Sequence, residues 1–437
     1  MKHRLGWYAP YVITLLSLGT ALNYYDRTLM GILVPAIKAD LHLSDGQIGL
    51  LSGLAFVSVY CLLGIPIARY ADRGQRVRVV AASLAFWSIM TSVCGFAAGF
   101  GSLFLARCGV GVGEAGGLPT TQAIVSEYSP SGWKVSALAL PIFASGIGQA
   151  LAAALGGLIA DRLGWRYAFW IAGIPGILLA LLVIATIRSQ QDHLVPTKPR
   201  AKGLQLRASV MTLLRKPSLL LLFAGLSVAS IGVYGGNAWA ATFLMRTFRL
   251  SASTVGPSYA AVVGPVFMVG SLLGGVLPDL IPSRHMRSAW WVVIASFAVN
   301  IPFSLALFFS ASFGWALVAA GGSILVLALY PAPTIALIQH LSGTRLRATG
   351  VAVFLAITNL VGLGLGPYII GHLSDLFATS LGSNSLRPAL TITVITSYFL
   401  GILLLLRASQ VYRKDSALNE HAPIDQEPPQ ALKRSET

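Results

Sequence analysis

The sequence predicts an all-α membrane protein with twelve transmembrane helices, arranged as two pseudo-symmetric six-helix bundles. Three observations support this fold class. Of the 437 residues, 55% are apolar and only 11% are charged, whereas about a quarter are charged in soluble domains. Twelve apolar segments are long enough to cross a hydrocarbon core about 30 Å thick. Polar motifs at the ends of these segments also recur in the second half of the chain.

The apolar segments divide the chain into two halves. The predicted spans are residues 10–37, 47–70, 77–98, 102–127, 135–161, 167–187, 217–245, 254–278, 287–310, 313–340, 347–374 and 388–407. They predict an N-terminal bundle at 1–187 and a C-terminal bundle at 217–407. The polar stretch 188–216 is predicted to be a cytoplasmic linker, and the polar, proline-containing stretch 408–437 a disordered cytoplasmic tail.

The positions of Lys and Arg predict the orientation. If both termini face the cytoplasm, cytoplasmic segments hold 23 of the 31 basic residues, external segments hold six, and two lie within spans. This excess follows the positive-inside rule. The net charge of +16 therefore indicates orientation rather than nucleic-acid binding. We expect a monomeric, multi-pass protein of a bacterial inner membrane, with the lipid bilayer as its surroundings.

Short motifs show that the two halves are repeats. The residues after the second span, Gly64 to Arg76, are similar to Gly274 to Arg284 after the eighth. The fifth span ends in Gly-Gly-Leu-Ile-Ala-Asp161, and the eleventh in Gly-His-Leu-Ser-Asp375. Pairing of span 2 with span 8, and of span 5 with span 11, fits two parallel six-helix repeats. Such repeats imply a substrate site between the halves, near the midplane of the membrane.

The chain resembles the major facilitator superfamily over nearly its whole length. The loop sequence Asp72-Arg73-Gly-Gln-Arg76 is similar to the superfamily's Asp-Arg-x-Gly-Arg motif, with the glycine one place early. The usual leading glycine is Ala68 here. The resemblance implies that Asp72, Arg73 and Arg76 form a cytoplasmic gate latch, with Asp279 as the weaker copy. The alternative is ordinary turn chemistry combined with positive-inside charge.

Within the superfamily, the Spinster-like branch is the most similar. Span 1 contains Asn23-Tyr-Tyr-Asp-Arg27, and span 4 contains Arg107-Cys-Gly-Val-Gly-Val-Gly-Glu-Ala115. These resemble the Asn-Tyr-x-Asp-Arg and Arg-x-x-x-Gly-x-Gly-Glu-Ala signatures of that branch. The resemblance implies alternating-access transport of lysophospholipids or sphingoid phosphates, with protons as the coupling ion.

Only four charged residues lie deep within the predicted spans: Asp26, Arg27, Arg107 and Glu114. Buried charges are costly in a membrane and are functional by default. We expect Glu114 and Asp26 to carry protons, and Arg27 and Arg107 to bind the anionic group of a substrate, because the guanidinium fork matches phosphate and carboxylate. Arg27 is expected to reach Glu114. The alternative is a static ion-pair network that joins spans 1 and 4.

Polar and aromatic residues on other spans are weaker candidates for cavity lining, and each could instead make a helix–helix hydrogen bond. They are Tyr60, Gln122, Gln149, Asn237, Trp239, Tyr330, Asn359 and His372. Pro331 and Pro333 predict a kink in span 10, because proline removes a helix hydrogen bond. This kink could be a hinge or only a packing bend.

Two function classes compete after this reading. The first is a proton-coupled exporter or flippase of an anionic amphiphile. The alternative is a proton-coupled symporter of a small organic anion, which would use the same four charges. An enzyme is not expected, because no catalytic set of carboxylates with His or a metal cluster is found. Neither His340 nor His372 has a second ligand at metal spacing, so we expect no metal and no cofactor.

Overall fold

The computed structural model describes residues 7–71, 75–129, 134–188, 203–281, 286–343 and 346–420, which are almost entirely helical. The N-terminal half comprises α1 (Tyr8–Leu41), α2 (Asp45–Ser52), α3 (Leu54–Tyr70), α4 (Arg76–Cys94), α5 (Phe100–Glu114), α6 (Gly117–Tyr128), α7 (Lys134–Leu163) and α8 (Trp165–Thr186). The C-terminal half comprises α10 (Pro217–Phe248), α11 (Ala252–Leu280), α12 (Arg287–Phe308), α13 (Phe313–Leu327), α14 (Pro331–Ser342), α15 (Arg347–Thr358), the π-helix η4 (Asn359–Leu365), α16 (Gly366–Leu381), the 3₁₀-helix η5 (Gly382–Asn384) and α17 (Leu386–Glu420). Helix α9 (Gly203–Leu214) lies between the halves in the chain.

The twelve predicted spans are present. Ten segments of the described residues are long and apolar enough to cross a membrane, judged by length and composition. The two other predicted spans are α1 and the pair α5–α6, which carry the four intramembrane charges and are therefore less apolar. Helix α1 packs along α7, and α5 packs against α4 and α3, so both cross the molecule beside the other spans.

Four spans are interrupted, although the sequence predicts only one break. Span 10 is interrupted between Leu327 and Pro331, as the prolines predict, since Pro331 stands in the first turn of α14. Span 2 breaks at Gly53, where a side chain would collide with the carbonyl oxygen of Gly364. Span 4 breaks between α5 and α6, and span 11 contains the π-helical turn η4. Such turns often occur at functional sites.

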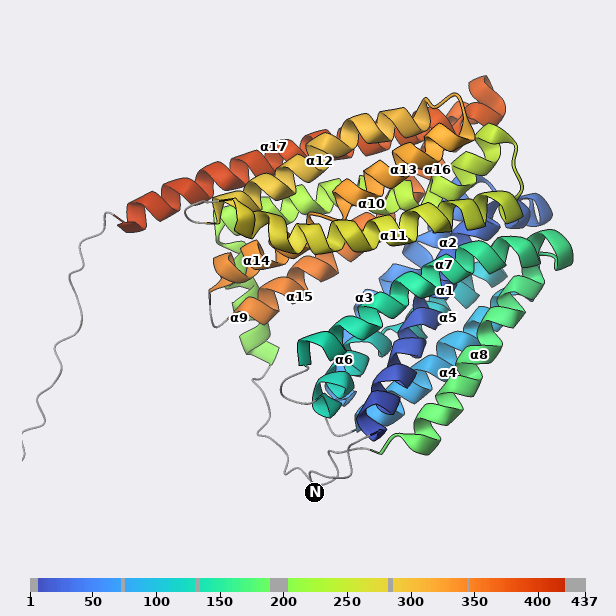
Figure 1. The fold of residues 1–437 in the computed structure, drawn as a ribbon, viewed down its shortest axis with the longest axis horizontal. Helices are drawn as coiled ribbons and strands as arrows, with labels where there is room; N and C mark the ends of the chain where they lie inside the picture. The colour runs from blue at the N-terminus through green and yellow to red at the C-terminus, as the bar shows by residue number, and fades with distance from the viewer. Residues whose placement is uncertain are drawn as a thin grey trace, which may run out of the picture.

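The two halves meet on one side of the molecule and diverge toward the other (Figure 1). They are joined through contacts of α7 with α11, of α2 with α16, of α1 with α10 and of α3 with η4. We call the side on which α9 and the final turns of α3 and α6 lie the linker side. Figure 1 shows α6 well apart from α14 and α15 there, whereas α2, α7, α11 and α16 come together at the opposite side.

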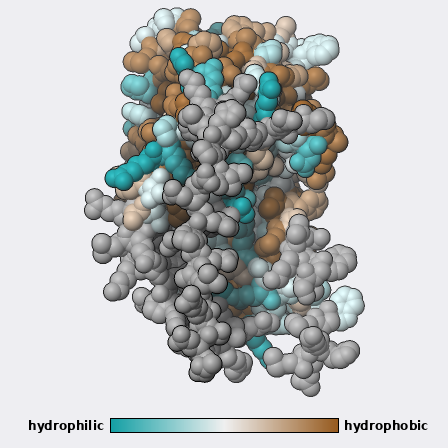
Figure 2. Space-filling model, turned by 90° about the vertical axis from the view of Figure 1, so that its left-hand side faces the viewer, coloured by the Kyte–Doolittle hydropathy of each residue, from teal (hydrophilic) through white to brown (hydrophobic). Residues whose placement is uncertain are grey.

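The outer surface is apolar, as a membrane protein requires. Helix α8 alone exposes Ile174, Leu178, Leu181 and Ile184 at 54–60% of their surface. In water such a stripe would be an aggregation hazard, but in a bilayer it is the surface that contacts the lipid tails. Figure 2 views the linker side, where hydrophobic surface covers much of the visible upper half and hydrophilic side chains are interspersed at this end.

The predicted linker contains a helix, and the predicted start of the tail differs from the structure. The linker 188–216 contains helix α9, whose sequence Gly203–Leu214 is rich in Leu, Gln, Arg and Ala, residues of high helix propensity. The predicted disordered tail begins too early, because α17 continues through Glu420. Residues 408–420 contain no Pro and no Gly, whereas Pro423 follows, so nothing in the sequence stops the helix at the membrane surface. Residues 421–437 lie outside the described part of the chain.

Candidate functional site

An ion pair between α1 and α5 lies at the centre of the site. The Nη2 and Nε atoms of Arg27 lie 2.6 Å and 2.8 Å from Oε2 of Glu114. The Glu114 side chain is fully buried, whereas 26% of the Arg27 side chain is exposed. The predicted reach of Arg27 to Glu114 is thus present in the structure. Both guanidinium N–H groups bond one carboxylate oxygen, and the other oxygen, Oε1, is buried with no hydrogen-bond partner among the described residues.

Three aromatic rings surround the Arg27 guanidinium. Its Cζ atom lies 4.7 Å from the ring centre of Phe56, 5.4 Å from that of Tyr24 and 5.5 Å from that of Tyr60. Phe56 and Tyr60 are four residues apart on α3, and their rings stack 5.5 Å apart. A cation is attracted to the faces of aromatic rings. The rings therefore hold the guanidinium in place even when Glu114 does not.

The second pair of charges lies deeper in the N-terminal half. Asp26 is 2% exposed, and its Oδ2 accepts a hydrogen bond of 3.0 Å from Thr91 of α4. Arg107, also 2% exposed, is close enough to Asp26 to interact with it electrostatically. The Arg107 guanidinium lies 5.8 Å from the ring centre of Phe56. All four intramembrane charges thus gather around Phe56, and their signs balance.

Arg27 is the one member of this cluster whose side chain is partly exposed. Arg27 is near Tyr234 of α10 in the C-terminal half, which is also near Tyr24 and Tyr60. Tyr234 in turn is near Tyr330. Tyrosines of both halves therefore face one another across the level of Arg27. Sequence analysis did not single out Tyr24, Tyr234 or Phe56, because an aromatic residue in an apolar span gives no signal of its own.

The weaker cavity-lining candidates separate into two groups. Tyr60 and Tyr330 belong to the tyrosine set described above, and Asn359 begins the π-helical turn. Two of the others make hydrogen bonds within the protein, and three are exposed. Trp239 is 1% exposed and donates a hydrogen bond of 2.9 Å to the carbonyl of Pro367, so in this conformation it joins α10 to α16. Gln149 bonds its own helix at Ser145; Gln122, Asn237 and His372 are exposed.

The predicted latch on the linker side is only partly within the described residues. Asp72 and Arg73 lie outside them. Arg76 begins α4 and forms an ion pair with Glu127 of α6, which belongs to the same half. Asp279 is exposed near the end of α11. This ion pair joins α4 to α6 within the N-terminal half.

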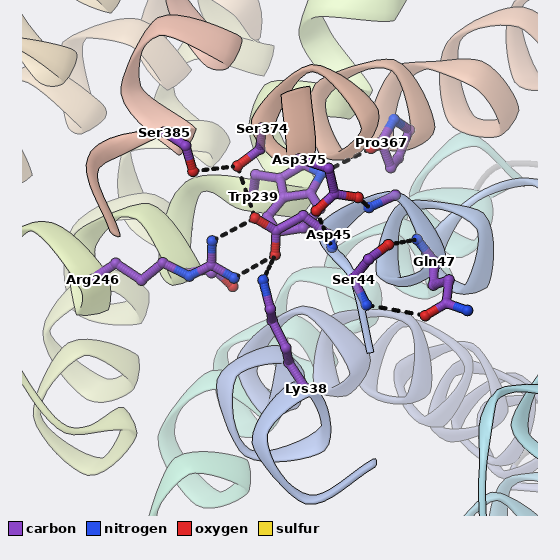
Figure 3. A network of polar contacts seen from close by, with 12 residues as sticks. Lys38, Ser44, Asp45, Gln47, Trp239, Arg246, Pro367, Ser374, Asp375 and Ser385 are labelled. Carbon is purple, nitrogen blue, oxygen red and sulfur yellow. Dashed lines mark hydrogen bonds and ion pairs between the residues drawn. The ribbon is translucent and has the colours of Figure 1, made fainter. Parts of the chain in front are cut away.

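A polar network that joins the halves lies on the opposite side (Figure 3). Arg246 of α10 forms a bidentate pair with Asp45 of α2, with N–O distances of 2.7 Å and 2.8 Å. Lys38 of α1 lies 2.6 Å from the same carboxylate, and Ser374 of α16 donates a hydrogen bond of 2.7 Å to it. The Asp45 side chain is only 3% exposed. This network closes the side away from the linker.

Sequence analysis missed Asp45 as a functional candidate, although a local signal existed. Ser44 and Gln47 form a capping box at the start of α2, and the pattern Ser-x-x-Gln before an apolar run is its signature. That signal predicts where the helix starts. It says nothing about Arg246, which is 201 residues further along the chain.

The fold and the intramembrane charge cluster can be compared with known proteins. Residues 16–367 match the family model of the Major Facilitator Superfamily. The chain belongs to the major facilitator superfamily. The transporter is also 35% identical, over 94% of each chain, to an "MFS-type efflux pump" of Mycolicibacterium smegmatis.

Further relatives agree with the Spinster-like signatures. The human "Protein spinster homolog 1" is 25% identical over 83% of this chain and 72% of its own. A crystal structure of a bacterial homologue of the human lysosomal transporter Spinster, inward-facing and occupied, superposes with a TM-score of 0.76 at 28% identity and covers 95% of this chain and 98% of the homologue. The transporter is also 25% identical to a "Benzoate transport protein" of Acinetobacter baylyi, over 84% of this chain and 83% of the relative.

Proposed function

We propose that this transporter moves an anionic amphiphile, such as a lysophospholipid or a sphingosine-phosphate-like lipid, by alternating access coupled to protons. The observation that supports this proposal best is the Arg27–Glu114 pair. Arg27 is the partly exposed cation of a buried cluster, and it lies where the tyrosines of both halves face one another. A substrate anion at this position would compete with Glu114 for the same guanidinium.

Competition for Arg27 provides a mechanism for coupling. Glu114 holds Arg27 through Oε2 alone, so protonation of the carboxyl group removes the charge that retains the guanidinium. Arg27 then has two N–H donors free for a phosphate or carboxylate. Loss of the proton restores the pair and expels the anion. Removing both compensating charges at once would leave Arg27 unpaired inside the membrane, which is costly.

Asp26 is the second proposed proton carrier, with a different partner. Arg107 is buried, so we assign it the role of countercharge to Asp26 instead of the substrate contact expected from the sequence. Thr91 can donate to either form of the Asp26 carboxyl group. A proton on Asp26 would leave Arg107 uncompensated, which couples this site to a rearrangement of α5.

The proposed orientation places the linker side in the cytoplasm, as the positive-inside count indicates. The halves are in contact on the opposite side, so the conformation described is open toward the cytoplasm. In the mechanism proposed above, the proton and the anion bind together, so an inward proton gradient drives the anion inward. The Mycolicibacterium relative is described as an efflux pump, and transport with the gradient imposed in either direction distinguishes import from export.

A second candidate is a proton-coupled symporter of a small aromatic carboxylate. Two observations favour it: the three rings around Arg27, which could stack on an aromatic acid, and the similarity to the benzoate transport protein. Its substrate would need no lipid tail. The two candidates therefore differ in whether a long acyl chain is required.

The first experiment measures movement of a labelled lysophospholipid in proteoliposomes, with and without a pH gradient. The variants are wild type and Glu114→Gln. One pH unit supplies about 1.4 kcal/mol per proton, so coupled transport should rise clearly with the gradient in the wild type and lose that dependence in Glu114→Gln. Asp40→Asn is the matched control, because Asp40 also pairs with an arginine but lies outside the cluster and the predicted latch.

Two outcomes would contradict the proposal. If Glu114→Gln keeps full dependence on the gradient, Glu114 does not couple protons. If folded wild-type protein moves no lysophospholipid but accumulates labelled benzoate, the symporter of small carboxylates replaces the lipid transporter.

A further inference from the structure

Two contacts on the side opposite the linker are copies of each other. In the first, Asp375 near the end of α16 accepts hydrogen bonds from the backbone N–H groups of Asp45 and Gly46 at the start of α2, at 2.8 Å and 2.7 Å. In the second, Asp161 near the end of α7 accepts one from the N–H of Ser253 at the start of α11, at 2.9 Å. Each carboxylate thus reaches the first turn of a helix in the other half.

Glycines make the close approach possible in both copies. A side chain at Gly371 would overlap the carbonyl oxygen of Asp45, and one at Gly157 would overlap that of Ala252. In each case the glycine stands four residues before the aspartate, one helical turn away on the same face. Glycine and aspartate therefore act together. The glycine lets the backbone of the facing helix come close, and the aspartate accepts hydrogen bonds from the N–H groups of that helix.

The correspondence extends one turn further into the membrane. Gly49 of α2 packs against the carbonyl of Pro367, and Gly256 of α11 packs against that of Ala153. Pro367 and Ala153 each stand four residues before the glycine of their own copy. The two interfaces are thus in the same register, α16 on α2 and α7 on α11, as the repeated halves require.

We propose that these Gly-x-x-x-Asp segments, Gly157–Asp161 and Gly371–Asp375, are paired clasps that close the outer gate and must open in each transport cycle. The inference depends on alternating access but not on the identity of the substrate or of the coupling ion. The aspartates are gating residues, because they contact the N-termini of helices, where exposed N–H groups and the helix dipole favour a negative charge.

The two clasps are unequal in strength. Asp375 accepts two N–H groups, one on each oxygen, and is partly buried. Asp161 accepts one and is exposed. The clasp between α2 and α16 is further reinforced by Asp45, which binds Arg246 and Lys38. At the corresponding position, the clasp between α7 and α11 has Ala252. The α2–α16 clasp should therefore be the one that limits opening.

A distance measurement across the gate tests the proposal. Spin labels are placed at Gly101→Cys in α5 and Ser380→Cys in α16, both exposed on this side, after replacement of Cys61, Cys94 and Cys108 by Ala. Double electron–electron resonance then gives the ratio of the open to the closed outer gate in detergent and in lipid nanodiscs.

Asparagine in place of each aspartate weakens the clasp without changing the size of the side chain. Asp375→Asn is expected to raise the open-to-closed ratio about tenfold, because asparagine has one acceptor oxygen and its NH₂ group must face an N–H. Asp161→Asn is expected to raise it only about threefold, since the remaining oxygen can keep the single bond. Asp40→Asn is the matched control: Asp40 lies on the same side but pairs with Arg166 of its own half.

Alanine at the glycines provides a second, independent measurement. Gly371→Ala and Gly157→Ala should each lengthen the measured distance, whereas Gly275→Ala, which meets open space, should not. The proposal is overturned if Asp375→Asn gives the same ratio as Asp40→Asn in protein that elutes as a single species. It is also overturned if the glycine variants resemble Gly275→Ala.

Discussion

At the scale of single residues, Arg27 combines three roles. It neutralises Glu114, it is surrounded by the rings of Phe56, Tyr24 and Tyr60, and it is the partly exposed cation of the cluster. Each role uses a property of guanidinium that the lysine ammonium lacks, namely a planar fork and a weakly hydrated face. In the proposed mechanism, Arg27 exchanges one anion for another without leaving its place between the rings.

Arg27→Lys is expected to weaken substrate binding about tenfold, even though the charge is kept, because the bidentate fork and the ring contacts are lost. The concentration dependence of transport in proteoliposomes provides the measurement. Arg166→Lys, on the side opposite the linker, serves as the control because Arg166 pairs with Asp40 away from the cluster. Unchanged apparent affinity in Arg27→Lys would mean that the substrate anion does not bind there.

Asp26 and Arg107 are buried charges that lie near each other, so the effects of removing them are expected to be non-additive. Asp26→Asn alone leaves Arg107 uncompensated and should destabilise the protein by about 3–5 kcal/mol. Asp26→Asn combined with Arg107→Met should restore much of this loss. Thermal unfolding in detergent, analysed as a double-mutant cycle, gives the coupling. Additive effects of the two substitutions would show that the pair is not coupled.

At the scale of elements, polar side chains join neighbouring helices at few but well-defined points. Asn300 of α12 is fully buried and donates hydrogen bonds of 2.7 Å and 3.0 Å to the carbonyl and hydroxyl groups of Ser323 in α13. The Ser304 hydroxyl donates a hydrogen bond of 2.7 Å to the side-chain oxygen of Asn300. In a membrane, where lipid competes equally for apolar surface, such bonds determine how helices pair.

Asn300→Ala is expected to lower stability by about 1 kcal/mol, the range measured for hydrogen bonds between membrane helices, with transport largely kept. Asn384→Ala is the matched control, because Asn384 is exposed in η5 and is not a cavity-lining candidate. Melting temperatures in detergent and transport rates are compared for both. A loss of transport in Asn300→Ala without a change in melting temperature would instead place Asn300 in the transport cycle.

At the scale of the whole molecule, the two halves are in contact on one side and diverge on the other. Many of the contacts between halves lie on the side opposite the linker, among them close backbone approaches at glycines and the Asp45–Arg246 pair. Rocking of rigid halves about the midplane requires these contacts to be broken as others form on the linker side.

The proposed orientation predicts which surfaces are reachable from outside the cell. In a variant lacking the native cysteines, Gly101→Cys should react with a membrane-impermeant maleimide in intact cells. Met211→Cys in α9, on the linker side and 48% exposed, should react only after the membrane is opened. The reverse labelling pattern would invert the orientation and, with it, the direction of proposed transport.

The sequence predicts the class of fold well because the physics involved is local. A span has to be apolar over its own length, and the excess of Lys and Arg on one side is visible residue by residue. The four charges within spans can be recognised in the same way, because a charged residue is costly inside a membrane and therefore rare in an apolar segment. Breaks in spans 2, 4 and 11 escaped prediction because glycine permits a break without requiring one, whereas Pro331 removes a helix hydrogen bond and so favours one.

By itself, the sequence determined that this protein lies in a membrane, that its two halves are repeats, and that spans 1 and 4 carry its buried charges. Only the tertiary structure decided which charges meet. Arg27 and Glu114 are 87 residues apart, and Asp45 and Asp375 are 330 residues apart. Such pairs depend on how whole helices rotate and cross. That is settled by packing over the full interface, so no short motif can encode it.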